Sequence, residues 1–256
     1  YAPLIESIAE LYQVQTDQVL LGNGSLELFY FMTMSELEKG DKVLVEAPSY
    51  DRTNLLLKRR GTIPVEVRME ADGVDLNAFE DAVKEHAPKL FYCIPDFQNP
   101  MGSTMSYAKR KAVGEIAEKY NFKIIEDSPY RQLRYFGDDV PQISALAVNP
   151  VRVIRVSSFS KTMSPGLRVG FFIGDSEVLK RIRIFIGNSY IGPVSVSQAL
   201  AYQFIKQGFY RTNLEKVKAL YRPRLQRTLE LLDERLSFTS YARPEGGFFV
   251  GVTLPD

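Results

Sequence analysis

Histidine and cysteine, which serve many catalytic and metal sites, each occur once among the 256 residues, and tryptophan is absent. One histidine cannot form the multi-histidine sites that hold zinc or iron, and no metal site is expected. It also excludes nucleophile–histidine catalysis unless His86 is the base. His86 stands just before Ala87 and Pro88, at the expected end of a helix, where solvated side chains are common. Catalysis is therefore expected to depend on lysine, carboxylates, tyrosine or a cofactor.

The single cysteine, Cys93, excludes an internal disulfide and suits a reducing compartment, so we expect a cytoplasmic protein. An excess of charge of either sign is also lacking, because 32 basic and 31 acidic residues leave a net charge of +1. No basic block indicates a nucleic-acid partner, and no polybasic run indicates a membrane surface. Apolar runs such as residues 169–174 are far too short to span a bilayer. We therefore expect neither nucleic acid nor a membrane as a partner.

Short apolar strands alternate with helices through the first two-thirds of the chain. The strands are rich in Val and Ile and apolar on both faces, which predicts an α/β fold with a mostly parallel sheet covered by helices on both sides. Strands are expected at residues 19–21, 42–46, 62–67, 89–94, 122–126, 151–156, 169–173 and 247–254. Helices are expected at residues 4–12, 25–38, 50–60, 76–86, 106–120, 176–187, 195–208 and 209–236.

The last two helices interrupt the alternation and indicate a change of domain. We expect residues 1–208 to form a large domain that binds the ligand. Residues 209–256 are expected to form a connecting helix and the start of a small C-terminal α+β domain. The chain begins inside an expected helix and stops just after an expected strand. This is typical of a fragment of a longer protein.

In an open α/β sheet, ligands bind beyond the carboxyl ends of the strands. The segments that follow the expected strands carry most of the unusual chemistry of this chain. These segments are residues 22–25, 48–50, 95–100, 127–130 and 157–161.

Each of these segments also has an ordinary explanation when it is taken alone. The Gly–Asn–Gly–Ser run can be a simple turn with Ser25 as the cap of a helix. Asp127 could cap a helix or pair with an arginine, and Asn99 before a proline commonly forms a turn. Lys161, in Ser–Ser–Phe–Ser–Lys, could be a solvated surface lysine.

Together, however, the segments complement one molecule, pyridoxal 5′-phosphate. This cofactor needs a lysine for a covalent bond and an acid beside its ring nitrogen, roles that Lys161 and Asp127 could fill. It also needs donors to its phenolic oxygen, an aromatic ring to stack on, and an anion site. The helix that starts after Gly24 and the guanidinium of Arg168 suit its phosphate.

The chain resembles the fold type I, class I and II aminotransferases, and most of all the branch of 2-aminoadipate and kynurenine aminotransferases. The matching segments follow the family's order over almost the whole chain: YAPL, GNGS, EAPSY, IPDFQNPMG, IIEDSPYRQLRYFG, SSFSKTMSPGLRVG and PEGGFFVGVTLP. The resemblance implies a large domain with a sheet of the seven-stranded type and ping-pong transfer of an amino group between an amino acid and a 2-oxo acid. It further implies 2-oxoglutarate as the acceptor and a homodimer with shared active sites.

The resemblance also implies a role for each matching residue. Lys161 corresponds to the lysine that forms the internal aldimine and carries the proton, and Asp127 to the carboxylate under the ring nitrogen. Tyr130 and Asn99 correspond to donors to the phenolic oxygen, with Tyr130 counted as catalytic together with Lys161 and Asp127. Tyr50 corresponds to the aromatic residue stacked on the ring.

The phosphate is expected to lie among backbone N–H groups, hydroxyls and one guanidinium. The expected ligands are Gly24, Ser25, Leu26, Ser158, Ser160 and Arg168. The family often has Gln where this chain has Leu26, so one side-chain donor is lost. The resemblance places two further residues outside the chain: a tyrosine from the partner subunit, upstream of Tyr1, and the arginine for the substrate carboxylate, beyond Asp256.

Two other readings stay open. The same core also resembles the ligand-sensing part of bacterial transcription regulators that carry a winged-helix DNA-binding region. Another reaction at the α-carbon with the same cofactor, such as decarboxylation, racemisation or β-elimination, is the third possibility.

Overall fold

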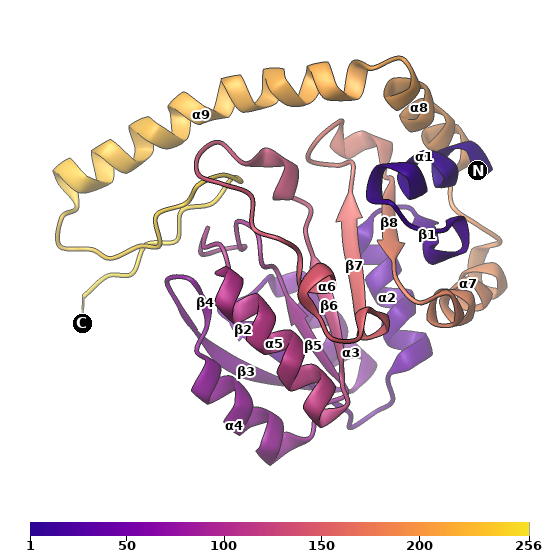
Figure 1. Ribbon diagram of the computed structural model, residues 1–256, viewed down its shortest axis with the longest axis horizontal. Coiled ribbons are helices and arrows are strands. Elements are labelled where there is room, and N and C mark those ends of the chain that lie inside the picture. The colour runs from indigo at the N-terminus through magenta and orange to yellow at the C-terminus, as the bar shows by residue number, and fades with distance from the viewer. Residues whose placement is uncertain (256) are drawn as a thin grey trace.

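The computed structural model describes residues 1–255. Its centre is one eight-stranded sheet with the order β1-β8-β7-β6-β5-β2-β3-β4, enclosed by helices (Figure 1). The strands are β1 (Val19–Gly22), β2 (Lys42–Ala47), β3 (Ile63–Glu70), β4 (Gly73–Val74), β5 (Leu90–Cys93), β6 (Lys123–Asp127), β7 (Val153–Ser158) and β8 (Gly170–Ile173). The α/β prediction is confirmed. The strand beyond the seven-stranded type is β4, which spans only two residues and was not predicted.

Five strands, β3, β2, β5, β6 and β7, run parallel to one another in the middle of the sheet, and the short β4 pairs antiparallel with β3 at one end. β8 runs antiparallel to both β7 and β1, so β1 points the same way as β7. The carboxyl ends of β1, β2, β5, β6 and β7 therefore lie at one edge of the sheet. This edge is called the carboxyl edge below.

The two faces of the sheet are covered by different helices, because successive strand residues point to opposite sides. On β1, Leu20 packs in the core on the α2 and α7 side, whereas Leu21 packs in the core on the α1 side. On β6, Ile125 joins the first of these cores, and Ile124 packs on the side of α4 and α5. The helices are α1 (Ala2–Tyr12), α2 (Ser25–Glu36), α3 (Asp51–Arg60), α4 (Leu76–His86), α5 (Tyr107–Tyr120), α6 (Ile143–Leu146), α7 (Ser176–Tyr190), α8 (Ser195–Lys206) and α9 (Phe209–Arg235).

Local sequence signals set several of these helix ends. The Asp75 side chain accepts hydrogen bonds from the backbone of Asn77 and Ala78 at 3.0 and 3.1 Å, so it caps α4. Gly61, with φ 83°, ends α3 in the left-handed conformation that glycine adopts without steric cost. These signals explain why the predicted boundaries of α3 and α4 lie within one residue of the observed ones.

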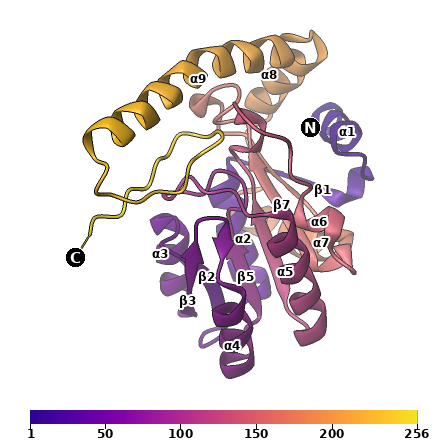
Figure 2. The ribbon, with the colours of Figure 1, turned by 60° about the vertical axis from the view of Figure 1, so that its left-hand side comes forward.

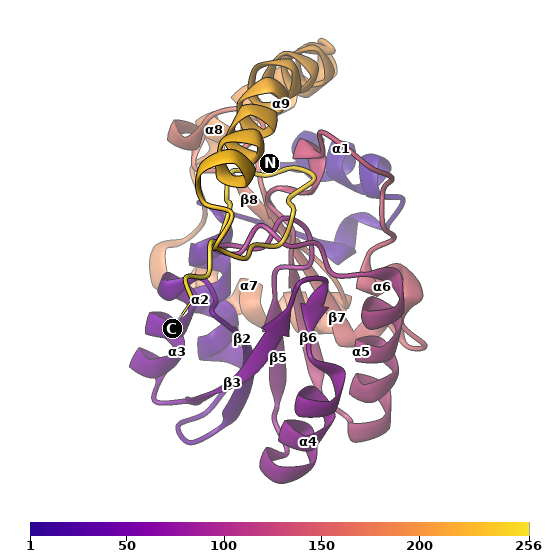
Figure 3. The same cartoon turned by 90° about the vertical axis from the view of Figure 1, so that its left-hand side faces the viewer.

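The prediction of a strand at residues 247–254 is wrong. Within the described residues, no strand lies beside this segment, and only isolated bridges form, Arg134 with Gly246 and Ser240 with Thr253. Its backbone pairs singly with loops instead, as when the N–H of Gly247 donates to the carbonyl of Leu133 at 3.0 Å. Figure 3 shows the segment lying across the loops at the carboxyl edge.

The long helix α9 passes over the carboxyl edge, above the C-terminal segment (Figure 2). It starts directly after Gly208, whose φ of 76° turns the chain between α8 and α9. The division into residues 1–208 and 209–256 stays a prediction. Among the described residues, no helix has the length and apolar character needed to cross a membrane.

Candidate functional site

The loops at the carboxyl edge enclose a cavity of about 360 Å³, called the strand-end pocket below. It lies where an open α/β sheet is expected to bind a ligand. Its lining residues are Ser25, Leu26, Tyr50, Ile94, Asn99, Asp127, Pro129, Tyr130, Ser158, Ser160, Lys161, Arg168 and Phe249. Every side chain predicted for the site contributes to this lining. Gly24, predicted to offer a backbone N–H, lies just behind it.

Lys161 follows β7 in the turn that leads to β8. Its Nζ lies 5.9 Å from the centre of the Tyr130 ring, on one side of the pocket. The residue as a whole is exposed and opens onto the pocket. A flexible primary amine that reaches into an open cavity is available for covalent bonding to a carbonyl.

Asp127 is the last residue of β6 and is buried. The hydroxyl of Tyr92, on the neighbouring strand β5, donates to Asp127 Oδ2 at 2.7 Å. The other oxygen, Oδ1, has no hydrogen-bond partner in the protein. Burial raises the pKa of Asp127 to about 7, and the Tyr92 hydrogen bond only partly offsets this. The pocket therefore holds a carboxyl group that lacks a positive partner.

Tyr130, Asn99 and Tyr50 come from three different loops. Tyr130 is buried, and burial is the main cause that raises the pKa of its hydroxyl, followed by the charge of Asp127. The Asn99 side chain acts in the opposite direction through a hydrogen bond to Tyr130. The hydroxyl of Tyr130 therefore stays protonated at neutral pH and can donate a hydrogen bond. Tyr50 is half-buried at the start of α3.

The other end of the pocket is formed by the start of α2 and the turn before β8. The N-cap of α2 is Gly24, with φ 109°, and not Ser25 as predicted. The reason is space: a Cβ at position 24 would lie 2.4 Å from Arg168 Nη2, so the guanidinium packs directly on the glycine. Ser25 is instead the first helical residue. The first N–H groups of α2 have no partner within the helix.

Two hydroxyls and one guanidinium complete this end. Ser158 Oγ and Ser160 Oγ lie 2.8 Å apart, and Arg168 Nη1 donates to Ser160 Oγ at 3.3 Å. Arg168 Nη2 donates to the carbonyl of Asn23 at 3.3 Å, which ties the guanidinium to the start of α2. Arg168 has no carboxylate partner among the described residues. Helix N–H groups, hydroxyls and an unpaired guanidinium together make a site for a phosphate or another anion.

Four contributors were not identified from the sequence: Tyr92, Ile94, Pro129 and Phe249. Tyr92 lies inside the apolar run Leu90–Cys93, where its hydroxyl gave no signal of a polar contact. Ile94 and Phe249 line the pocket without polar chemistry. The Phe249 ring stands 5.5 Å from the Tyr130 ring at an angle of 86°, so the C-terminal segment closes one wall of the pocket.

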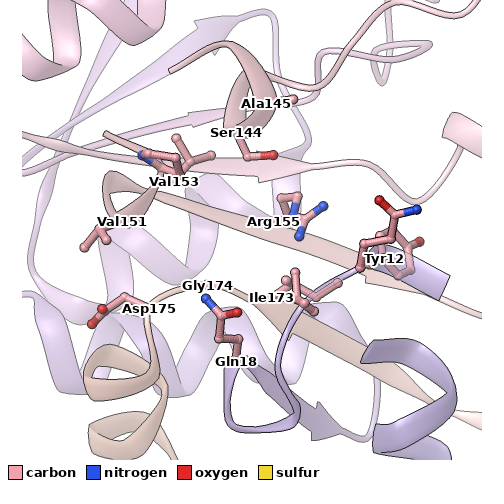
Figure 4. Close-up of a pocket in the computed structure, with 13 residues that line it drawn as sticks. Tyr12, Gln18, Ser144, Ala145, Val151, Val153, Arg155, Ile173, Gly174 and Asp175 are labelled. Atoms are coloured by element: carbon pink, nitrogen blue, oxygen red, sulfur yellow. The ribbon is translucent and has the colours of Figure 1, made fainter. Parts of the chain in front are cut away.

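A second cavity, of about 300 Å³, lies between α1 and α6, away from the strand-end pocket (Figure 4). It contains the guanidinium of Arg155, which lies over the Tyr12 ring at 5.5 Å. No predicted site residue lines it. Residues 1–255 hold no cluster of His, Cys, Asp and Glu suited to a metal ion.

A family model described as aminotransferase class I and II matches residues 1–256. Among curated proteins, the 2-aminoadipate transaminase of Thermus thermophilus is 34% identical, and the match covers 100% of this chain and 65% of that protein. Two uncharacterized HTH-type transcriptional regulators of Bacillus subtilis are 28% identical over 94% and 99% of this chain. The match covers 50% and 54% of those regulators.

Solved structures agree with the family match. The multiple substrate aminotransferase of Thermococcus profundus superimposes with a TM-score of 0.94 at 29% identity, over 100% of this chain and 66% of that one. The α-aminoadipate aminotransferase of Thermus thermophilus, complexed with N-(5′-phosphopyridoxyl)-L-leucine, gives a TM-score of 0.91 at 32% identity, with the same coverage. The chain thus spans about two-thirds of the length of the proteins that it matches.

Proposed function

Because the chain belongs to the family of class I and II aminotransferases, we propose that it binds pyridoxal 5′-phosphate in the strand-end pocket and transfers amino groups between an amino acid and a 2-oxo acid. The family and its solved structures imply this cofactor. One observation carries the proposal. The pocket joins a reachable lysine, a buried carboxyl without a positive partner, and an anion site at a helix N-terminus.

The ring end of the cofactor fits the environment of Asp127. The free Oδ1 and the raised pKa mean that this carboxyl would gain from a cationic N–H beside it. A protonated pyridine nitrogen is such a group, and its charge would return the pKa of Asp127 to a lower value. Tyr92 would then fix the orientation of the carboxylate through its bond to Oδ2.

The phosphate end fits the start of α2. The N–H groups of Ser25 and Leu26 point out of the helix end, where the helix dipole favours an anion. Gly24 would add a further N–H. Arg168 and the hydroxyls of Ser158 and Ser160 would surround the remaining oxygens. Because Leu26 has no side-chain donor, the hydroxyls and the guanidinium would supply the side-chain hydrogen bonds to the phosphate.

The chemistry then depends on where protons are held. Bound pyridoxal phosphate supplies a ring that accepts the electron pair released when the substrate Cα–H bond breaks. The amine of Lys161, when it is not bonded to the cofactor, would be the base that takes the Cα proton. The hydroxyl of Tyr130 and the amide of Asn99 would donate to the phenolic oxygen, and the ring of Tyr50 would be available for stacking on the cofactor. Members of the family bind substrates and release products in ping-pong order, so the first 2-oxo acid leaves before the second binds.

A second copy of this chain is the proposed partner. Apolar side chains of α7, α8 and the loop between them face solvent beside the pocket: Ile191 is 93% exposed, and Ile184, Val194, Val196 and Leu200 are more than half exposed. The loop is fixed to the start of α2, because the Val194 N–H donates to Asn23 Oδ1 at 3.0 Å. A homodimer would cover this surface next to the phosphate site.

The amino donor is proposed to be a 2-aminoadipate-like or aromatic amino acid, with 2-oxoglutarate as the acceptor, in the cytoplasm. The name of the 2-aminoadipate transaminase relative supports the donor. The test is an amino-donor screen on the intact gene product, with 2-oxoglutarate present and glutamate measured. Conversion of at least one donor, with pyridoxal phosphate required, supports the proposal; no conversion of any amino acid contradicts it.

A role as the sensing core of a transcription regulator is the second candidate. It is favoured by the two regulators that match nearly the whole chain. In that case the same screen would show cofactor binding without glutamate formation, and an amino acid would change DNA binding by the intact gene product. Formation of carbon dioxide or ammonia without glutamate would instead indicate another α-carbon reaction.

A further inference from the structure

Two buried polar side chains, Glu46 and Gln98, lie directly behind the strand-end pocket. Each is only 1% exposed, and neither lines the pocket or has a role in the proposed chemistry. Glu46 is near the end of β2, whereas Gln98 lies in the loop that follows β5. The two strands are neighbours in the sheet, so the side chains meet across adjacent strand ends.

Glu46 Oε2 holds the start of the loop after β5. It accepts hydrogen bonds from the backbone N–H of Ile94 and from Gln98 Nε2, both at 3.1 Å. Ile94 is a pocket-lining residue. One carboxylate oxygen on β2 therefore fixes two points of the neighbouring loop.

Gln98 uses its whole amide. Besides Glu46, Nε2 donates to the carbonyl of Pro48 at 2.8 Å, and Oε1 accepts from the N–H of Met101 at 2.8 Å. Pro48 lies two residues before Tyr50, and Asn99 directly follows Gln98. The amide thus bonds to the segment that carries Tyr50 and to the loop that carries Asn99.

We propose that Glu46 and Gln98 act as a clamp that sets the spacing between the Tyr50 loop and the Asn99 loop, and so position both residues on the cofactor. The proposal rests on the proposed function of the pocket. Glu46 and Gln98 are positioning residues, since neither touches the pocket itself. Their effect on the reaction would pass through the ring-stacking residue and the donor to the phenolic oxygen.

The energetics favour positioning over stabilisation. Burial of a carboxyl and an amide costs free energy that well-packed apolar side chains would not cost. The pKa of Glu46 is raised to about 7, mainly by burial and to a smaller extent by the nearby charge of Asp127, and the hydrogen bonds from Gln98 and Ile94 only partly offset this. Glu46 Oε1 has no partner in the protein, so the desolvation of the carboxyl is not fully compensated. The pair instead fixes the distance between the two loops, because hydrogen bonds have a defined length and direction and apolar contacts do not.

Four variants of the intact gene product test the clamp. Glu46→Ala and Gln98→Met remove the clamp. Gln98→Met keeps the side-chain volume, so this variant still tests the proposal if Glu46→Ala does not fold. Glu46→Gln keeps an oxygen that can accept from both donors. Glu66→Ala is the matched control, because Glu66 lines the same outer cavity as Glu46 but is exposed.

The first readout is amide hydrogen exchange in cofactor-free protein. Glu46→Ala and Gln98→Met are expected to lose protection in residues 48–50 and 94–102 together, whereas Glu46→Gln and Glu66→Ala keep it. The second readout is the pH titration of the cofactor–lysine absorbance band. In Glu46→Ala and Gln98→Met, the titration midpoint is expected to shift in the same direction as in Asn99→Ala. Their kcat/KM is expected to be lower by about 100-fold, which is the effect of misplacing catalytic groups by about 1 Å. The Glu46→Ala/Gln98→Met double variant should be no worse than the more affected single variant.

Additive effects in the double variant would overturn the clamp. So would lower thermal stability with an unchanged titration and unchanged kcat/KM, since this would make the pair merely structural. Failure of the proposed function is distinguishable: wild-type protein would then show no cofactor–lysine band, while the exchange data would still decide whether Glu46 and Gln98 couple the two loops.

Discussion

The strand-end pocket and the cavity between α1 and α6 have similar sizes but different chemistry. The strand-end pocket measures about 360 Å³ and the cavity between α1 and α6 about 300 Å³. Both contain an arginine near aromatic rings. In the second cavity, Arg155 lies over Tyr12 (Figure 4). It also donates to Gln142 Oε1 at 3.4 Å. Asp175 at its rim accepts from the N–H of Val178 at 3.0 Å and so caps α7.

The polar groups of the strand-end pocket are not used up in this way. Asp127 has a free oxygen, and the start of α2 offers free N–H groups, whereas Arg168 and Arg155 are alike in having no carboxylate partner among the described residues. The unmatched groups of the strand-end pocket are opposite in sign and lie at different ends of one cavity. A ligand with a cationic ring and an anionic tail would satisfy all of them. Unsatisfied complementary groups, not volume, therefore distinguish a binding site from a packing defect.

The largest expected effect comes from Lys161→Ala in the strand-end pocket. Loss of the amine should abolish both the cofactor–lysine absorbance band and amino transfer, because no other pocket residue can form the covalent bond. Absorbance spectra and glutamate formation measure this. A lysine-type band that survives the substitution would contradict the assignment of Lys161.

Asp127→Asn should lower kcat by at least about 100-fold while some cofactor still binds, because the neutral amide no longer stabilises a protonated ring. Steady-state kinetics on cofactor-saturated protein measure this effect. Turnover equal to that of the wild type would exclude the electrostatic role of Asp127.

The same variant should change stability in a pH-dependent way. The folded-state pKa of Asp127, about 7, lies above the ordinary value of 3.8. The stability given by the neutral carboxyl is thus fully present below pH 4 and lost as the pH rises through 7. In cofactor-free protein, the free energy of unfolding of Asp127→Asn relative to that of the wild type should increase by about 2 to 4 kcal/mol between acidic pH and pH 8. Denaturant unfolding of both proteins at both pH values measures this increase. A difference between variant and wild type that stays the same at the two pH values would contradict the prediction.

Arg168→Met should weaken cofactor binding by about 10- to 100-fold, the value of one or two charge-assisted hydrogen bonds. The pocket keeps Lys161 and the helix N-terminus, so binding is weakened and not abolished. Equilibrium dialysis with pyridoxal phosphate gives the dissociation constant. An unchanged constant would place the phosphate elsewhere.

Arg155→Met is the counterpart in the second cavity and should have the smallest effect. Its guanidinium contributes a cation–π contact with Tyr12, worth about 0.5 to 2 kcal/mol of stability. Cofactor affinity should stay within about twofold of the wild type, since the cavity lies away from the pocket. A loss as large as that of Arg168→Met would remove the distinction between the two cavities.

The sequence predicted the strand-end pocket well because its signals are local. Apolar runs followed by glycine, proline and polar residues marked the ends of β1, β2, β5, β6 and β7 correctly. The segment at residues 247–254 shows the limit, since its strand-like pattern reflects contact with loops. Gly247 is required for two reasons: its φ is 70°, and a Cβ there would lie 2.5 Å from the side chain of Phe97. Tyr92 and Gln98 were missed because their partners, Asp127 and Glu46, are remote in sequence.

The most direct test of the central claim is to find where the cofactor attaches. Wild-type protein is incubated with pyridoxal phosphate, reduced with borohydride, digested, and mapped by mass spectrometry. The account predicts one pyridoxyl group per chain, on the peptide that contains Lys161, and none on that peptide when excess pyridoxamine phosphate occupies the pocket first. Labelling of a different lysine, or no specific labelling, would contradict the account.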